Sequence, residues 1–398
     1  MKPISRRASQ ISPSPTLALD AKAKAMQAQG LDVISFAVGE PDFNTPEHIG
    51  QAGIDAIKQN FTRYTPAAGI PDLKQAVCQR LKTDFGQEYE PNQIVVSNGA
   101  KHSLYNSFTA LIDEGDEVIL PTPCWVSYTE QIKLLGGVPV FVEAKEENGF
   151  VMTAAQFEAA ITPKSKVLML NSPSNPTGGV YTAENLKGIA DLCVKHGIYV
   201  IADEIYASLL YDGLKFVSIT EFGDEIKDLT IVVNGVSKSY AMTGWRIGYT
   251  ASTVELAKIM GDIQSHMTSN AGNISQKAAV MALNGPQDSI EAMRVEFEKR
   301  RNYMVEKVNS IPGLSCNNPG GAFYVFANIT NFFGKTIRGI KINNGTDLCN
   351  VILEEAKVAV VPGIAFEAEG FMRFSYANSM ENIIEGLNRV EALLKEAV

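Results

Sequence analysis

The sequence predicts an α/β protein in which helices wrap a mostly parallel sheet, followed by a smaller α+β part. Apolar, strand-like runs alternate with segments of helical spacing through the middle of the chain, a pattern typical of parallel sheets. The chain has 398 residues, of which 45% are hydrophobic and 20% charged. That length allows two or three domains, and that composition can bury a sizeable core.

Six short apolar runs are the expected strands of the sheet, and the segments between them carry helical spacing, as in Ala183–His196. In such sheets, ligands bind beyond the carboxyl ends of the strands. The residues that follow each run are therefore the candidates for binding a ligand. The runs are Gln93–Ser97, Glu117–Pro121, Pro139–Val142, Lys166–Leu170, Ile198–Ala202 and Thr230–Val233.

A long charged helix, Gln287–Ser310, marks the expected boundary of the sheet-containing part. We predict a large domain over residues 46–295 and a small domain built from residues 1–45 and 296–398. The small domain should contain four further features: a strand-like Ala322–Phe326, a polar insertion at Asn328–Gly345, an apolar Val358–Val361 and an amphipathic helix at Met380–Glu396.

Composition excludes several classes of function. The formal net charge of −9 argues against a nucleic-acid partner, because phosphate backbones attract basic surfaces. The five cysteines include no CxxC pair, and the four histidines have no metal-ligand spacing, so neither a disulfide framework nor a metal site is expected. No apolar stretch is long enough to span a membrane. A cytoplasmic compartment fits the free thiols best.

Lys238 and Arg246 follow the strand-like Thr230–Val233 in a loop of small residues. A lysine at the end of a strand can form an imine with an aldehyde cofactor, and an arginine can bind the phosphate of that cofactor in a two-pronged manner. For an isolated pair, a surface lysine beside a loop arginine is the better interpretation. Here three other segments end in polar groups that suit the same cofactor, so we favour the functional one.

Asp203 and Tyr206 follow another predicted strand, Ile198–Ala202, which precedes Thr230–Val233 in the sequence. An aspartate there can keep a pyridine nitrogen protonated, so that the ring withdraws electrons, and Tyr206 can hydrogen-bond the phenolic oxygen of the ring. Asp203 as a helix N-cap and Tyr206 as an ordinary core residue are equally good interpretations when this segment is taken alone.

Two loops after strands can supply further contacts. In Asn171–Gly178, Asn175 precedes a proline, which favours extended backbone and can direct its amide into the cleft. In Ser97–Ser103, Gly99, Ala100 and Lys101 lie where a helix begins, and exposed backbone N–H groups at a helix start bind anions. Plain turns are the rival interpretation for both loops.

Trp125 and Arg373 complete the set of candidates. Trp125 follows a strand and a Pro-x-Pro turn, where an aromatic ring can stack on a planar ligand. Arg373 lies inside the apolar Phe371–Tyr376, and a buried arginine needs an anionic partner such as an amino-acid carboxylate. A core tryptophan and a structural salt bridge are the alternatives.

Together these segments resemble class I aminotransferases, members of the fold-type I superfamily of pyridoxal-phosphate-dependent enzymes. Three N-terminal segments, Ser12–Thr16, Ala37–Phe43 and Tyr64–Pro71, resemble the bacterial and plant-plastid aspartate aminotransferase subgroup, some members of which use prephenate. The resemblance covers essentially the whole chain. It implies a large domain with a mostly parallel seven-stranded sheet, pyridoxal 5′-phosphate as the cofactor, and a homodimer with shared active sites.

The resemblance also implies how the cofactor is held. Lys238 would form a Schiff base with it, and Asp203 would pair with its pyridine nitrogen. Tyr206 and Asn175 would bind its phenolic oxygen, and Trp125 would stack on its ring. Its phosphate would lie near Gly99, Ala100, Lys101, Arg246 and the lysine's neighbour Ser237, together with Tyr64 of the other subunit.

For the substrate, the resemblance implies that the α-carboxylate is held by Gly39, Asn175, Trp125 and Arg373. Lys101 is linked in this subgroup to the distal carboxylate of aspartate or glutamate. The segment Ser14–Thr16 would close over bound substrate. The implied reaction is a ping-pong transfer of the amino group from aspartate to 2-oxoglutarate, with Lys238 moving the proton.

The chain departs from related subgroups at two points. Gly235 stands where other subgroups carry a phosphate-binding serine, and the dedicated arginine for the distal carboxylate cannot be located. Prephenate or aromatic aminotransferase activity, or a β-lyase on the same scaffold, therefore remains an alternative. A non-catalytic regulator with a DNA-binding segment is disfavoured, because too few residues precede the first enzyme-like motif.

Overall fold

The computed structural model describes residues 4–5, 7–13 and 15–398, and its main feature is a seven-stranded sheet. The strand order is β2-β8-β7-β6-β5-β3-β4, and only β8 runs antiparallel to its neighbours. The strands are β2 (Ile94–Ser97), β3 (Glu117–Thr122), β4 (Val138–Glu143), β5 (Ser165–Asn171), β6 (Tyr199–Asp203), β7 (Thr230–Gly235) and β8 (Gly248–Ala251). The predicted α/β class with a mostly parallel sheet is confirmed.

Each of the six predicted strands lies within one or two residues of its observed bounds. No predicted strand corresponds to β8, whose four residues Gly-Tyr-Thr-Ala have little apolar character. Its backbone is nonetheless buried, because it pairs with β2 on one side and β7 on the other. Burial between two strands thus overrides the weak local pattern.

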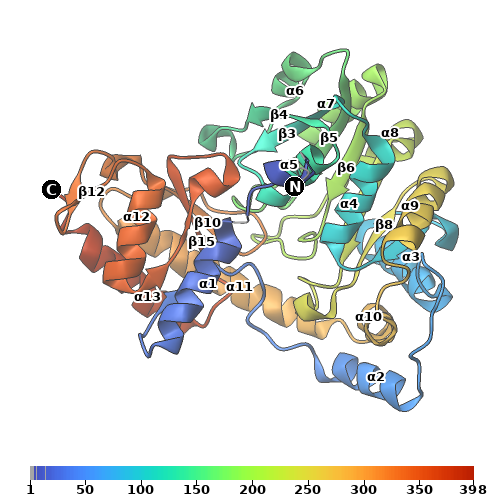
Figure 1. The fold of residues 1–398 in the computed structure, drawn as a ribbon, viewed down its shortest axis with the longest axis horizontal. Coiled ribbons are helices and arrows are strands. Elements are labelled where there is room, and N and C mark those ends of the chain that lie inside the picture. Colours follow the sequence, from blue (N-terminus) through green and yellow to red (C-terminus); the bar gives the residue numbers. More distant parts are fainter. Residues whose placement is uncertain (1–3, 6, 14) are drawn as a thin grey trace.

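Helices cover both faces of this sheet (Figure 1). Side chains of α4, α5 and α9 pack on one face, and those of α3, α6, α7 and α10 pack on the other. The helices are α2 (Glu47–Lys58), α3 (Pro71–Phe85), α4 (Ala100–Leu111), α5 (Val126–Leu134), α6 (Ala154–Ala160), α7 (Ala183–His196), α8 (Asp224–Asp228), α9 (Val254–Met267) and α10 (Asn273–Asn284).

A second, antiparallel sheet of order β14-β15-β10-β9 belongs to the C-terminal part. Its strands are β9 (Ser315–Cys316), β10 (Tyr324–Asn328), β14 (Val361–Pro362) and β15 (Phe371–Ser375), and helices α12 (Gly345–Val351) and α13 (Met380–Leu394) accompany them. The polar insertion Asn328–Gly345 contains a small hairpin of β11 (Thr336–Ile337) and β12 (Ile340–Lys341). Its two turn residues, Arg338 and Gly339, both have positive φ, as a two-residue hairpin turn requires.

The N-terminal segment contacts this C-terminal part. Strand β1 (Ile34–Ser35) pairs in parallel with β13 (Val358–Ala359), and helix α1 (Pro15–Ala28) lies beside β13 and β14. The division into residues 46–295 and the two termini stays a prediction. In the described part of the chain, no helix is long and apolar enough to cross a membrane.

Helix α11 (Asp288–Ser310) runs from the α10 region toward the second sheet (Figure 1). Two consecutive buried arginines tie it to segments from distant parts of the sequence. Arg300 binds Asp42 at 2.7 Å, and Arg301 binds Asp212 at 2.6 Å. The helix therefore fixes both the stretch after Gly39 and the stretch after Tyr206.

Candidate active site

A cavity of about 440 Å³ lies at the carboxyl ends of β5, β6 and β7. It is the location that parallel sheets favour for ligands. The structure brings most of the predicted site residues to its wall: Gly39, Ala100, Lys101, Trp125, Asn175, Asp203, Tyr206, Ser237, Lys238, Arg246 and Arg373. Gly99 directly precedes the wall residue Ala100. Tyr64 does not line the cavity and is 91% exposed.

Lys238 lies three residues beyond the end of β7, and its Nζ donates a hydrogen bond to the carbonyl of Gly39 at 2.5 Å. Burial lowers the pKa of its amine to about 8, and the cations Arg246 and Arg373 act in the same direction. The carboxylates of Glu40 and Asp203 partly oppose that decrease. A substantial neutral fraction near pH 7–8 is what an amine nucleophile or proton carrier requires.

Asp203 is the last residue of β6 and is 3% exposed. The hydroxyl of Tyr128 donates to its Oδ2 at 2.7 Å, and the backbone N–H of Ile205 donates to its Oδ1 at 3.2 Å. Burial raises the pKa of this carboxyl to about 6, and those two hydrogen bonds counteract the increase. A cationic partner in the cavity would therefore hold Asp203 in its charged form.

Asn171, at the end of β5, connects Asp203 with Asn175. Its Nδ2 donates to the carbonyl of Asp203 at 3.0 Å, and its Oδ1 accepts from the backbone N–H of Asn175 at 2.9 Å. The side-chain Oδ1 of Asn175 accepts a hydrogen bond from Arg373 Nη1 at 2.8 Å. Because this bond occupies the amide oxygen, the NH₂ group of Asn175 remains as a donor for a ligand.

Arg373 is 2% exposed, and its second terminal nitrogen donates to the carbonyl of Ala37 at 2.7 Å. Its guanidinium lies 4.5 Å from the ring centre of Tyr324 and 4.9 Å from that of Phe366. Across residues 4–5, 7–13 and 15–398, no carboxylate pairs with Arg373, and its Nε has no hydrogen-bond partner. A buried guanidinium without an anion suits a ligand carboxylate.

Arg246 and the start of α4 form a second place for an anion. Gly99 is the N-cap of α4 with φ of 83°, a conformation that favours glycine. A Cβ at position 99 would collide with the guanidinium of Arg246, and one at Gly248 would collide with the backbone of Ala100. Two glycines thus allow the guanidinium of Arg246 to approach the N-terminus of α4. A cation beside a helix N-terminus suits a phosphate.

The family model for class I and II aminotransferases matches residues 31–390. The chain belongs to this family. It is 47% identical to the aspartate aminotransferase of Geobacillus stearothermophilus over 98% of this chain and 99% of that protein. It is 46% identical to the "Probable aspartate/prephenate aminotransferase" of Aquifex aeolicus over 99% of each chain.

Solved aminotransferase structures share the fold. The aspartate aminotransferase of Rhizobium meliloti superposes with a TM-score of 0.96 at 42% identity, covering 100% of both chains. The Thermus thermophilus enzyme solved with maleate superposes with a TM-score of 0.93 at 39% identity, covering 99% of this chain and 100% of that one. The suspected family and its fold-type I architecture are confirmed.

Gly235 departs from the serine of other aminotransferase subgroups for a visible reason. A Cβ at this position would lie 2.9 Å from the carbonyl oxygen of Ile247 and 3.0 Å from the Cα of Gly248. The close pairing of β7 with β8 leaves no room there for a side chain. Ser237, which lines the cavity, is 6% exposed.

Sequence reasoning gave no role to several residues of this aminotransferase's cavity. Asn171 begins a loop that the sequence analysis singles out and Tyr128 follows Trp125 by three residues, but only the fold shows that both contact Asp203. Tyr324 is the first residue of β10, and it reaches the cavity from the other sheet. Glu40 lies at the wall with its carboxylate 2.7 Å from the hydroxyl of Thr243.

The N-terminal segment reaches the same cavity. Thr16 and Lys24 of α1 line it, and the backbone N–H of Ser12 donates to Glu130 at 2.8 Å. Ser14, the first residue of the predicted closing segment, lies outside the described residues. Among the residues described, no group of three or more His, Cys, Asp or Glu side chains could hold a metal ion.

Proposed function

We propose that the protein is a pyridoxal-phosphate-dependent aspartate aminotransferase that uses 2-oxoglutarate as the amino acceptor. One observation carries the proposal: a partly buried lysine with a lowered pKa, a buried carboxylate and a buried arginine that meets no carboxylate among the described residues line one cavity. The near full-length similarity to aspartate aminotransferases supports the same donor.

The residues of the cavity fit pyridoxal 5′-phosphate. Lys238 would bind its aldehyde carbon, and Asp203 would pair with its pyridinium nitrogen. Asn175 and Tyr206 would bind its phenolic oxygen, and Trp125 would stack on its ring. Its phosphate would be held by Arg246, Ser237 and the start of α4. When bound, this cofactor supplies an aldehyde and an electron-withdrawing ring that acidifies the α-hydrogen of an amino acid.

Asp203 accepts hydrogen bonds from the hydroxyl of Tyr128 and the N–H of Ile205, but these donors carry no positive charge. A protonated pyridine would supply the cation that balances the carboxylate. Tyr128 and Ile205 hold its two oxygens in place, so the carboxylate is fixed before the ligand arrives. A fixed charge at that point costs little reorganisation during the reaction. Asp203 thus keeps the ring protonated, and its raised pKa reflects the burial that makes this interaction strong.

Lys238 would act as general base and acid once an amino acid has displaced it from the cofactor. Its pKa of about 8 lets the neutral amine accept the α-hydrogen as a proton and return it to a different carbon. The carbonyl of Gly39, 2.5 Å from Nζ, orients the amine within the cavity. In the second half of the cycle, a keto acid reverses these transfers.

Arg373 would bind the substrate α-carboxylate with two parallel hydrogen bonds, and Asn175 beside it would contribute a third donor. Lys101 lies with its Nζ 4.8 Å from the ring centre of Trp125, on the same wall. It is the candidate for the distal carboxylate of aspartate or glutamate. The Trp125 ring would exclude water from the reacting face.

The second candidate activity is prephenate or aromatic aminotransfer. It is supported by the Aquifex aeolicus relative, and by a cavity in which no third arginine joins Arg246 and Arg373 among the described residues. A single lysine accommodates a range of distal groups better than a two-pronged arginine does. A β-lyase reaction would use the same Lys238 but would eliminate the substituent on the β-carbon of the substrate.

We also propose that the protein is a homodimer with shared active sites. Each subunit would have two domains, a large one of residues 46–295 and a small one built from residues 1–45 and 296–398. The 91% exposure of Tyr64 suits a residue that reaches the cofactor phosphate of the partner subunit. The pairing of β1 with β13 supports a small domain built from both ends of the chain. Closure of that domain would exclude water from the substrate.

The test is the absorption spectrum of the cofactor-loaded protein before and after aspartate alone. Conversion of the visible band to that of the aminated cofactor supports the proposal, and an unchanged band overturns aspartate as donor. Lys238→Ala should abolish turnover, whereas Lys187→Ala, at an exposed helix pair with Asp191, should retain it. Product analysis with 2-oxoglutarate and prephenate then separates the two acceptors and would reveal any β-elimination.

A further inference from the structure

Two tyrosine hydroxyls meet at the wall of the cavity. The Oη atoms of Tyr206 and Tyr324 lie 2.9 Å apart, and the side chains are 3% and 0% exposed respectively. Tyr206 follows β6 of the large sheet, whereas Tyr324 begins β10 of the second sheet. The contact therefore joins the two sheets at the position where the proposed function places the phenolic oxygen of the cofactor.

The number of protons decides which hydroxyl donates. The hydroxyl of Tyr206 carries one proton, and the proposed function directs that proton to the phenolic oxygen of the cofactor. The oxygen of Tyr206 can then only accept the hydrogen bond from Tyr324, 2.9 Å away, so Tyr324 must be the donor. Burial raises the pKa of both hydroxyls, so both keep their protons near neutral pH. The guanidinium of Arg373, which lies over the ring of Tyr324, cannot accept a hydrogen bond and so does not compete for the proton of Tyr324.

We propose that Tyr324 is a positioning residue that donates its proton to Tyr206 Oη and so directs the proton of Tyr206 into the cavity, toward the phenolic oxygen. This inference rests on the proposed function. A hydroxyl that already accepts one hydrogen bond is also a stronger donor, because chains of hydrogen bonds polarise one another. Tyr324 thus acts on the cofactor through Tyr206.

Contacts on both sides of the tyrosine pair fix the positions of Tyr206 and Tyr324 relative to each other. At the cavity, a Cβ on Gly39 would lie 2.8 Å from Tyr324 Oη, so the glycine leaves the space that this hydroxyl occupies. Farther out, the segments that carry the tyrosines pair with each other: Tyr211 N–H donates to Gly320 O, and Ala322 N–H donates to Leu209 O, each at 3.0 Å.

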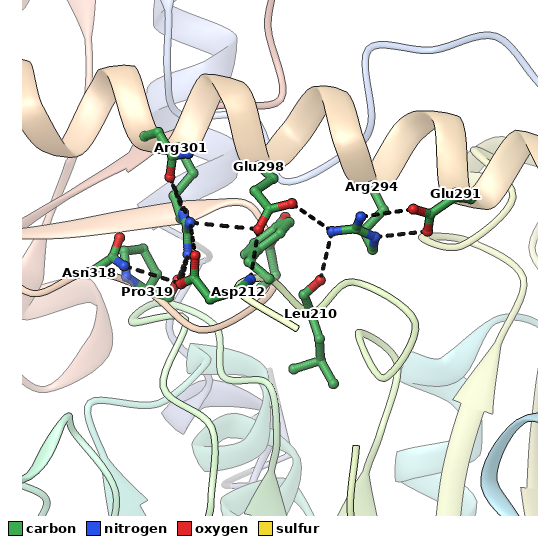
Figure 2. Close-up of polar contacts among 11 residues, drawn as sticks. Leu210, Asp212, Glu291, Arg294, Glu298, Arg301, Asn318 and Pro319 are labelled. Atoms are coloured by element: carbon green, nitrogen blue, oxygen red, sulfur yellow. Dashed lines mark hydrogen bonds and ion pairs between the residues drawn. The ribbon is translucent and has the colours of Figure 1, made fainter. Parts of the chain in front are cut away.

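Arg301 closes the outer end of that pairing (Figure 2). Its guanidinium donates to both carboxylate oxygens of Asp212 and, at 3.0 Å, to the carbonyl of Pro319. Asp212 follows the Tyr206 segment, and Pro319 precedes the Tyr324 segment. One buried cation therefore binds both segments, which restricts sliding of one tyrosine relative to the other.

The test compares Tyr324→Phe, Tyr206→Phe and the double variant, each loaded with pyridoxal phosphate and without substrate. The measured quantity is the pH midpoint of the visible absorption band. A proton donated to the phenolic oxygen stabilises its anionic form, so losing the donor should raise the midpoint. We expect Tyr324→Phe to raise it by about 0.5–1 pH unit and Tyr206→Phe by more. The double variant should match Tyr206→Phe alone.

Kinetics provide a second measurement. Tyr324→Phe should lower kcat about 3- to 10-fold while the KM for aspartate changes less than about 2-fold, because the hydroxyl acts on the cofactor and not on the substrate carboxylate. The matched control is Tyr376→Phe, which removes another fully buried hydroxyl that bonds to Ala322 O at 3.3 Å, away from the cavity wall. It should leave the midpoint unchanged.

The outcomes separate this inference from the proposed function. A wild-type protein that shows no visible band with pyridoxal phosphate overturns the proposed function itself. A wild-type band that shifts in Tyr206→Phe but not in Tyr324→Phe overturns the role of Tyr324 alone. Additive shifts in the double variant also overturn it, because they mean that Tyr324 does not act through Tyr206.

Discussion

The guanidinium of Arg301 and the carboxylate of Asp212 bind each other through two hydrogen bonds of 2.6 and 2.8 Å, with the arginine 1% and the aspartate side chain 51% exposed (Figure 2). The arrangement is asymmetric: a deeply buried cation is neutralised by an anion that water still reaches. Removing the anion therefore leaves a charge in the interior, and removing the cation leaves only a surface carboxylate.

Asp212→Ala should lower the free energy of unfolding by about 2 kcal/mol, because Arg301 stays buried with the carbonyl of Pro319, the amide of Asn302 and a carboxylate, that of Glu298, only at 3.9 Å. Urea unfolding at pH 7 measures the loss. Glu291→Ala is the matched control, since its carboxylate pairs with Arg294 at the surface and is 64% exposed (Figure 2). That change should cost less than about 1 kcal/mol. Equal losses would contradict the importance of burial.

Tyr128→Phe should reduce kcat about 10-fold, because a charge-assisted hydrogen bond to Asp203 is lost. Burial raises the pKa of Asp203 to about 6 in the cofactor-free structure and this hydrogen bond opposes the increase, so losing the donor should raise the pKa in the loaded enzyme as well. Because the charged form is the active one, the acid limb of the kcat profile should move to higher pH. A pH–rate profile with aspartate measures both effects. An unshifted acid limb would exclude Asp203 as its origin.

Lys238→Met should stabilise the apoprotein near pH 7. The pKa of Lys238 is lowered from 10.5 to about 8 by burial, so protonation of this amine favours the unfolded chain. The resulting penalty is absent above about pH 10.5, grows as the pH falls, and is complete below about 8. The expected gain at pH 7 is about 1–3 kcal/mol and should vanish toward pH 10.5. Thermal unfolding of both apoproteins across this range measures it, and a gain that does not depend on pH would contradict the charge argument.

Gly235→Ala should cost about 1–3 kcal/mol, because the added methyl group meets the backbone of Ile247 and Gly248, where β8 begins, at 2.9–3.0 Å. Gly244→Ala is the matched control, because nothing lies within 4 Å of a Cβ at that position. Its effect should stay within about 0.5 kcal/mol. The urea concentrations at which the two variants are half unfolded measure this difference in stability. Equal stability of the two variants would mean that the β7–β8 pair can move apart.

Much of the fold could be predicted because most strands of the large sheet are buried apolar runs, as in Thr230–Val233, and its helices keep their spacing, as in Ala183–His196. Strand β8 could not, because its burial comes from two neighbouring strands and not from its own side chains. The same distinction holds for the site. Asp203 ends an apolar strand and Lys238 follows one closely, so both could be identified from the sequence. Tyr324 begins a strand of another sheet, and only the folded chain shows that it reaches the cavity.

Residues that act through other residues were the hardest to find from sequence. Tyr128 stands three positions after Trp125, but nothing in that spacing indicates that its hydroxyl binds Asp203, 75 residues away. Asn171 likewise looks like the first residue of a turn until its amide is seen to join Asp203 of β6 to the backbone of Asn175. Such contacts depend on strand order, which the local pattern of apolar and polar residues does not contain.

The consecutive arginines of α11 have a consequence for how this chain can change over time. Arg300 and Arg301 bind carboxylates on different segments, and neighbouring residues of a helix differ in direction by about 100°. Inserting or deleting one residue ahead of them would turn both side chains away from Asp42 and Asp212 together. Length variation should therefore be strongly selected against in this helix.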